Sequence, residues 1–435
     1  MGGDERVDVG AVDSVLDDCG ELVRLGRRSA RRADGWTARQ HSVLLHVTTV
    51  RSAGPAIHPT TLGVGGCEVV GNLGPMRAAE AGRARARSDV VRAVHRGLGL
   101  EALTRSFVGA LRRVVPFEGT CLLTVDPTTL LPTGEIVDNG LPPTARIRLT
   151  EIELREPDFN KFTALARADV PAASLSGATG GQLDRSARQR DVRRPYGFGD
   201  ELRCMLRGPT GTWGSLTLLR EAGRPAFTPV EVRFVASLAA PLADGVRQAT
   251  LLNDVTVDGP QTDTGFLLVA PDGSVELAND AAQRWLDELT VAGRSTIPLP
   301  MAVRAVVTQA RHVAEGGATV ATARVRSRCG RWVVVRGSTV GAGGGIAVLI
   351  EPARPAEQAS AFADIYGLTE RERTVTELVA RGLSTKEIAN RLHVSAYTVQ
   401  DHLKAIFDKT GATSRGALVA QLFLEQHLGP LTDAT

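Results

Sequence analysis

Near the C-terminus, apolar residues recur at the spacing of one helix face. The positions i, i+4, i+7 and i+8 of this stretch are occupied by Val399, Leu403, Ile406 and Phe407. The opposite face carries Tyr397, Gln400, Asp401, Lys404 and Asp408. The pattern predicts a helix with one buried face and one face of hydrogen-bonding side chains.

Capping signals divide the surrounding residues into short helices. Thr369 and Glu372 have the spacing of a capping box, and so do Ser384 and Glu387. Ser395 is a suitable N-cap for the helix described above, and a further apolar, helical pattern follows it. Two short helices, a tight turn and a longer helix predict a helix-turn-helix with an added helix on each flank.

The polar face of the third helix has side chains that can read bases. Gln400 can bond adenine through two hydrogen bonds, Asp401 can accept from cytosine, and Lys404 can donate to guanine or to phosphate. We therefore expect these three residues to face the bases of a DNA major groove.

A second set of residues, at the starts of the second and third helices, is expected to contact DNA phosphates. Helix N-termini and hydroxyl groups favour anions. The set consists of Lys386, Ser395, Tyr397 and Thr398.

This region resembles the LuxR-type DNA-binding domain of bacterial transcription regulators. The resemblance rests on Leu368-Thr369-x-Arg371-Glu372, Gly382-Leu383-Ser384-x-Lys386-Glu387-Ile388-Ala389, Val394-Ser395-x-x-Thr398-Val399-x-x-His402-Leu403, Lys409 and Ser414-Arg415. It implies that the third helix enters the major groove and that the fourth supports dimer contact. Many members have a basic residue where this chain has Gln400, so the base preference does not carry over.

Residues 76–253 have the pattern of an α+β domain with an antiparallel sheet. A helical pattern over 78–115 is followed by strand patterns, a helix signal over 157–168, two strands joined by a turn, and a helix from Thr228. The closing run from Trp213-Gly214-Ser215-Leu216 to Phe227-Thr228-Pro229 is similar to a GAF domain.

Residues 262–352 are expected to form a second α+β module. Two strands flank the turn Pro271-Asp272-Gly273, Asn279 precedes a helix, and three strands end the module. This order resembles a PAS domain. Residues 353–364, with Pro355, are interpreted as a linker, and residues 365–428 as the LuxR-type domain. Residues 1–75 are expected to be a poorly ordered extension.

Composition narrows the protein class. The 435 residues are 43% hydrophobic and 23% charged, with a net charge of +3, which predicts several globular domains and only a mild basic balance. No apolar run has the length of a membrane span, and the first residues do not have a signal-peptide pattern, so a cytoplasmic protein is expected. Five scattered cysteines argue against a disulfide framework or a zinc site.

The sequence contains no Walker A, HExxH or GxSxG motif, so we expect no enzyme, no metal and no identified cofactor. The favoured interpretation is a homodimeric regulator that binds double-stranded DNA under the control of its two α+β modules. These modules either bind a small molecule or serve in dimerisation and docking. The alternative is a signalling scaffold in which the modules and the helix-turn-helix bind protein partners.

Overall fold

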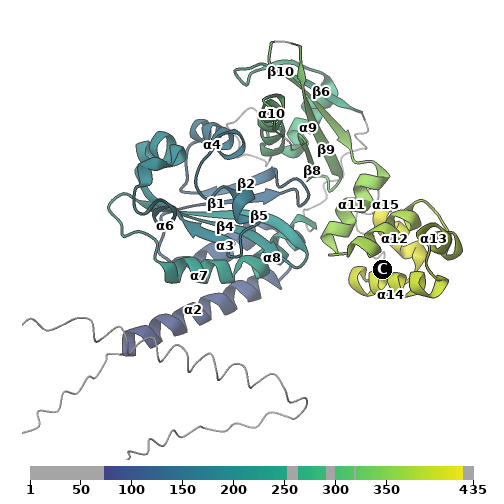
Figure 1. The fold of residues 1–435 in the computed structure, drawn as a ribbon, viewed down its shortest axis with the longest axis horizontal. Helices are drawn as coiled ribbons and strands as arrows, with labels where there is room; N and C mark the ends of the chain where they lie inside the picture. Colours follow the sequence, from purple (N-terminus) through teal and green to yellow (C-terminus); the bar gives the residue numbers. More distant parts are fainter. Residues whose placement is uncertain (1–72, 252–262, 291–298, 318–319, 342, 425–435) are drawn as a thin grey trace, which may run out of the picture. The chain divides into compact units, whose positions relative to one another are not determined.

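Five antiparallel strands form the first sheet, in the spatial order β2-β1-β5-β4-β3 (Figure 1). The computed structural model describes residues 73–251, 263–290, 299–317, 320–341 and 343–424. The strands are β1 (Gly119–Val125), β2 (Pro132–Asp138), β3 (Ala172–Ser174), β4 (Phe198–Gly208) and β5 (Gly211–Glu221). We refer to residues 73–251, which contain this sheet, as the first module.

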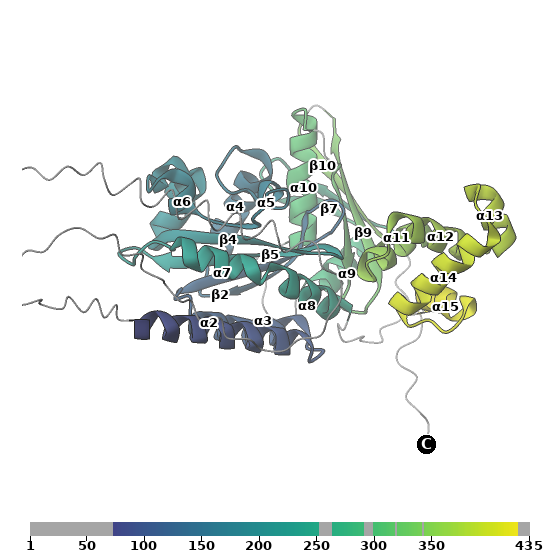
Figure 2. The same cartoon turned by 60° about the horizontal axis from the view of Figure 1, so that its bottom comes forward.

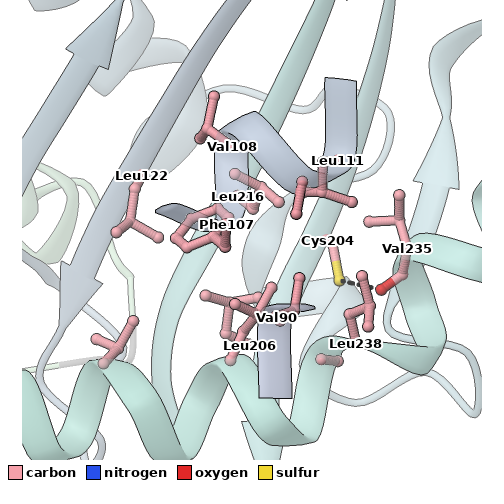
Figure 3. Packing of buried hydrophobic residues seen from close by; sticks show 14 of the residues in the cluster. Val90, Phe107, Val108, Leu111, Leu122, Cys204, Leu206, Leu216, Val235 and Leu238 are labelled. Atoms are coloured by element: carbon pink, nitrogen blue, oxygen red, sulfur yellow. Dashed lines mark hydrogen bonds between the residues drawn. The ribbon is translucent and has the colours of Figure 1, made fainter. Parts of the chain in front are cut away.

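Helices with apolar faces cover one side of this sheet. They are α2 (Leu73–Val94), α3 (Leu100–Arg112), α7 (Pro229–Ser237) and α8 (Ala239–Leu251). Phe107 and Leu111 from α3 pack with Leu216 of β5 and Val235 of α7 in a core from which solvent is excluded (Figure 3). The helical pattern over 78–115 is thus two helices, and the break falls at Gly97, whose φ of 61° suits glycine.

Short helices and irregular segments cover the other side of the first sheet. Figure 2 shows α4, α5 and α6 opposite α2 and α3. The elements are α4 (Pro143–Arg155), α5 (Phe162–Leu165), α6 (Leu175–Thr179), the 3-10 turns η3 (Leu183–Arg185) and η5 (Arg194–Tyr196), and the π-helix η4 (Arg188–Arg193). The helix expected over 157–168 is therefore reduced to α5, whereas α4 was not predicted.

A second antiparallel sheet has the order β7-β6-β10-β9-β8. Its elements are β6 (Gly265–Val269), β7 (Val275–Ala278), α9 (Asp280–Leu289), α10 (Met301–Ala314), β8 (Thr322–Arg326), β9 (Trp332–Val340) and β10 (Gly345–Pro352). Asn279 joins strand to helix, since its Oδ1 accepts from the amides of Phe266 at 3.0 Å and Ala282 at 2.8 Å. We refer to residues 263–352 as the second module.

The linker expected over 353–364 is a helix instead, α11 (Pro355–Ile365). Proline is favoured at the first position of a helix, where its missing N–H has no partner to lose. Glu357 then accepts from the Arg354 amide at 2.8 Å, and Phe362 and Ala363 are buried in the C-terminal core. The predicted extension over 1–75 lies outside the described residues, except that residues 73–75 begin α2.

Four further helices complete the C-terminal helical domain (residues 355–424). They are α12 (Glu370–Ala380), α13 (Thr385–Leu392), α14 (Ala396–Thr410) and α15 (Arg415–Leu424). These helices confirm the predicted helix-turn-helix with a flanking helix on each side. The two sheets followed by a helical domain likewise confirm a multidomain α+β architecture. None of the helices in the described residues is long and apolar enough to cross a bilayer.

Candidate nucleic-acid interface

Local hydrogen bonds define both the start of α13 and the turn between α13 and α14. Ser384 and Glu387 form the predicted capping box, with the Glu387 amide 3.3 Å from Ser384 Oγ and the Ser384 amide 2.7 Å from Glu387 Oε2. His393 then adopts the left-handed region with a φ of 55°, and the Val394 amide donates to the Ala389 carbonyl at 3.0 Å. The turn therefore sets the direction in which α14 leaves α13.

Helix α14 buries the predicted apolar stripe. Val399 and Ile406 are fully buried, and Leu403 retains 8% exposure. They pack with Val375 and Val379 of α12, among other residues of the same core. This packing fixes the rotation of α14 about its axis, so its opposite face points away from the domain.

The three residues predicted to face bases share that outward face. Gln400, Asp401 and Lys404 are exposed, and within the described residues their side chains form neither hydrogen bonds nor ion pairs. They lie within five residues on one helix, so they occupy about one and a third helical turns. Their donors and acceptors are free to bind another molecule.

The residues predicted to contact phosphates lie at two helix N-termini. Lys386 is exposed in the first turn of α13, and Tyr397, in the first turn of α14, is 80% exposed. Ser395 caps α14 by accepting from the Thr398 amide at 3.0 Å, and the two hydroxyl groups lie 2.9 Å apart. Ser395 and Thr398 thus already share a hydrogen bond at the helix end.

An ion pair that the sequence did not predict locks the end of α14 to the start of α12. Lys409 Nζ lies 2.5 Å from Glu372 Oε2, and the Glu372 side chain is only 7% exposed. Burial acts to raise the pKa of Glu372, but hydrogen bonds from Lys409 and Thr369 outweigh it, so the pKa lies below its ordinary value. Lys409 is therefore a structural residue of the domain. The sequence signal that could have identified Lys409 was its match to the LuxR-type motif.

Replacing Glu372 with glutamine should destabilise the helix-turn-helix by about 1–2 kcal/mol at neutral pH, because a charge-assisted hydrogen bond is lost while glutamine can still complete the capping box. The carboxylate has a lowered pKa when folded, so its contribution is complete above the unfolded value near 4.5 and is lost as pH falls below it. Hydrogen exchange of the α14 amides measures the stability of the helix-turn-helix in the native and Glu372→Gln proteins. Equal exchange rates in the two proteins at pH 7 would contradict it.

Other site classes find no support in the described part of the chain. Its histidine, cysteine, aspartate and glutamate side chains form no group of three or more that could hold a metal ion. Cys121, Cys204 and Cys329 are free thiols. Residues 365–424 contain eight basic and six acidic side chains, so this region has only a small excess of positive charge.

Comparison with known proteins assigns this domain to a family. Residues 367–422 match the family model described as bacterial regulatory proteins, luxR family. The C-terminal helical domain is a LuxR-family helix-turn-helix domain.

The matches to curated relatives each cover a short stretch of this chain. A putative HTH-type transcriptional regulator of Mycobacterium bovis is 54% identical over 52 residues, which is 12% of this chain and 6% of that protein. The spore germination protein GerE of Bacillus subtilis is 42% identical over 13% of this chain and 74% of its own length. The nitrate/nitrite response regulator protein NarL of Escherichia coli is 40% identical over 14% of this chain and 28% of its own length. The chain spans under a third of the length of the first relatives it matches.

Proposed function

We propose that this protein is a transcription regulator that binds double-stranded DNA by placing α14 in the major groove. The supporting observation is the exposed, unpaired set Gln400, Asp401 and Lys404 on the second helix of a LuxR-family helix-turn-helix. In helix-turn-helix proteins this helix contacts base edges while the preceding helix crosses the backbone. An α-helix fits the major groove, and these three side-chain types match its donor and acceptor pattern.

A gel-shift experiment with the full chain tests this proposal. The chain is expected to retard fragments of its source genome at low salt and to select a subset of them as salt rises, because non-specific contacts weaken first. No retardation of any duplex at low salt would favour the alternative in which the helix-turn-helix is a protein contact.

Phosphate contacts should be made by residues at the helix N-termini. Replacing Lys386 with alanine is expected to weaken binding to all duplexes alike and to reduce the slope of log K against log salt by roughly one unit, because one phosphate is no longer neutralised. The slope is measured on a selected and a scrambled duplex. A sequence-dependent loss would place Lys386 at a base instead.

We also propose that the first module is GAF-like, that the second is PAS-like, and that both regulate the DNA-binding domain. The support is the sheet-and-helix order of each module, together with one connecting side chain. Arg324 of β8 lies 2.9 Å from Asp126 in the first module and 2.7 Å from Asp364 in α11. A change in either module would thereby alter a contact of α11, which packs into the core of the DNA-binding domain.

A homodimer is proposed as the binding form, since helix-turn-helix dimers read two half-sites. In α15, Leu418 and Leu422 are already buried within the domain, so a dimer contact through α15 would use its remaining surface. Sedimentation velocity with and without a selected duplex measures the stoichiometry.

A further inference from the structure

Positive charge is concentrated in the first two helices of the first module, α2 and α3. Residues 77–113 contain nine arginines and three acidic residues, which is an excess of six positive charges. The whole chain has a net charge of +3, so the rest of the chain is negative overall. Residues 365–424, which contain the helix-turn-helix, have an excess of two. More uncompensated positive charge therefore lies in α2 and α3 than in the helix-turn-helix.

Most of this charge is not neutralised by neighbouring side chains. Four of the nine arginines form ion pairs, in the combinations Arg92 with Asp89, Arg113 with Asp89, Arg105 with Glu101 and Arg112 with Asp138. The other five form neither an ion pair nor a hydrogen bond with another described residue, and they are Arg77, Arg83, Arg85, Arg87 and Arg96. Glu80 is the one further acidic residue of this stretch.

The unpaired arginines lie on the outer surface of α2 or directly after it. The inner face of α2 is apolar and is buried in a core with residues of α3 and α8, through Ala86, Val90, Ala93 and Val94. Figure 2 shows α2 on the side of the first sheet away from α4, α5 and α6. Arg77, Arg85 and Arg87 are exposed residues of this helix. Their guanidinium groups can therefore reach a partner without any movement of the core.

The surface between these arginines indicates what kind of partner fits. Its exposed side chains are small, namely Ala78, Ala79, Ala81, Ala84 and Ser88. Within residues 77–113, none of the exposed side chains is a large apolar one. A helix that lies on a membrane needs a large apolar face, and protein interfaces are centred on large desolvated side chains. Small side chains among unpaired arginines instead let a charged backbone approach the helix closely.

We propose that the outer surface of α2 is a second DNA-binding surface, on which Arg77, Arg85 and Arg87 bind phosphates of duplex DNA independently of its sequence. The choice of duplex DNA as the partner rests on the proposed function of α14. Guanidinium groups donate paired hydrogen bonds to phosphate oxygens. Basic residues clustered along a helix are the electrostatic pattern of nucleic-acid binding.

The spacing of the three arginines lets each bind a different phosphate. Arg77 and Arg87 are ten residues apart on α2, which is about 15 Å along the helix axis. Phosphates of one DNA strand follow one another about every 3.4 Å along the duplex, so this length spans about four of them. Each neutralised phosphate contributes about 0.9 to the slope of log K against log salt. Three contacts therefore predict a contribution of about 2–3 units.

Replacing Arg77, Arg85 and Arg87 together with alanine in the full chain tests this surface. Alanine has the highest helix propensity, so α2 should be retained. Fluorescence anisotropy measures binding to a scrambled duplex and to one selected from a random pool, over a series of salt concentrations. The affinity for both duplexes should fall by the same factor, about tenfold or more at low salt, and the salt slope should fall by about 2–3 units.

The matched control replaces Arg185, Arg190 and Arg194 with alanine, which removes the same charge from the same module. These arginines are exposed in η3, η4 and η5, on the other side of the first sheet. Two of them are already paired, Arg190 with Asp191 and Arg194 with Asp184. The control should change the salt slope by less than about one unit. Protection from maleimide of Cys204, which is buried in the same core as Val90 of α2, shows that each variant is folded.

Three results would overturn the proposal. The first is an equal loss of affinity, or no loss, in the α2 variant and the control. The second is a loss confined to the selected duplex, which would make the contact specific for sequence. The third is binding to phosphatidylglycerol vesicles that the α2 substitutions abolish while both duplex affinities stay unchanged, which would assign the surface to a membrane.

Failure of the proposed role of α14 gives a different result. A native chain that bound selected and scrambled duplexes equally well would show that α14 does not read bases. A loss of that binding in the α2 variant alone would still support the α2 surface. Conversely, a chain that prefers the selected duplex, with an α2 variant that matches the control, would overturn the α2 surface and leave the role of α14 in place.

Discussion

Replacing Glu201 with glutamine is expected to lower the free energy of unfolding of the first module by about 3–5 kcal/mol, because it leaves buried guanidinium groups without their shared carboxylate. Glu201 is fully buried and pairs with Arg188 at 2.9 Å, with Arg203 at 3.0 Å and with Arg193. Glutamine has nearly the same shape, so packing is retained and the measured effect is that of the charge.

The pH dependence of the stability of the first module should reflect the ionisation of the Glu201 carboxylate. Burial acts to raise the pKa of Glu201, but Arg188, Arg193 and Arg203 together lower it to about 2. Because the folded pKa is depressed, the stabilisation is complete above the unfolded value of about 4.5 and is lost as pH falls from there towards 2. In Glu201→Gln this part of the acid sensitivity should be absent.

Labelling of Cys204 in a urea series measures this module separately from the others. Cys204 is a fully buried residue of β4, so its thiol reacts with maleimide only when the sheet opens. Glu221→Gln is the control, since Glu221 is exposed at the end of β5, and its effect should stay within about 0.5 kcal/mol. If the free energies of unfolding of the two variants differed by less than about 1 kcal/mol, Glu201 would not be the carboxylate that stabilises Arg188, Arg193 and Arg203.

The helix-turn-helix could be predicted closely from sequence because its signals are local. Thr369 with Glu372 and Ser384 with Glu387 form the predicted capping boxes, and Ser395 forms the predicted cap. The stripe from Val399 to Ile406 fixes which face of α14 is buried. These local signals do not identify the partner of Lys409. Glu372 lies 37 residues away, and only folding brings the two side chains together.

The polar face of the first sheet could not be predicted for a similar reason. Two strands joined by a turn were predicted in this part of the chain, but charged residues such as Glu201 and Arg203 are expected on a solvent-facing side. They are buried because Arg188 and Arg193, from an irregular segment without periodicity, supply partners. Likewise Pro355 was interpreted as part of a linker, whereas its place at a helix start depends on the packing of Phe362 in the C-terminal core.

Replacing Lys404 with alanine should cost about 1–3 kcal/mol of binding free energy on the preferred duplex, and much less on a scrambled one, if Lys404 donates to a guanine. The preferred duplex is first selected from a random pool with the native chain. Affinities are then compared at two salt concentrations. If Lys404 contacted a phosphate, the substitution would lower the affinity for both duplexes alike and change its dependence on salt. Glu370→Ala is the control, since Glu370 is 87% exposed at the start of α12.

Replacing Asp401 with alanine should have the opposite effect on non-specific DNA. Its carboxylate repels the phosphate backbone unless a cytosine amino group donates to it, and it has no ion-pair partner within the described residues to neutralise it. The variant is therefore expected to bind scrambled duplexes more tightly than the native chain and to lose base preference at one position of the selected site. Unchanged affinity and unchanged preference in both Asp401→Ala and Lys404→Ala would mean that this face of α14 does not read DNA.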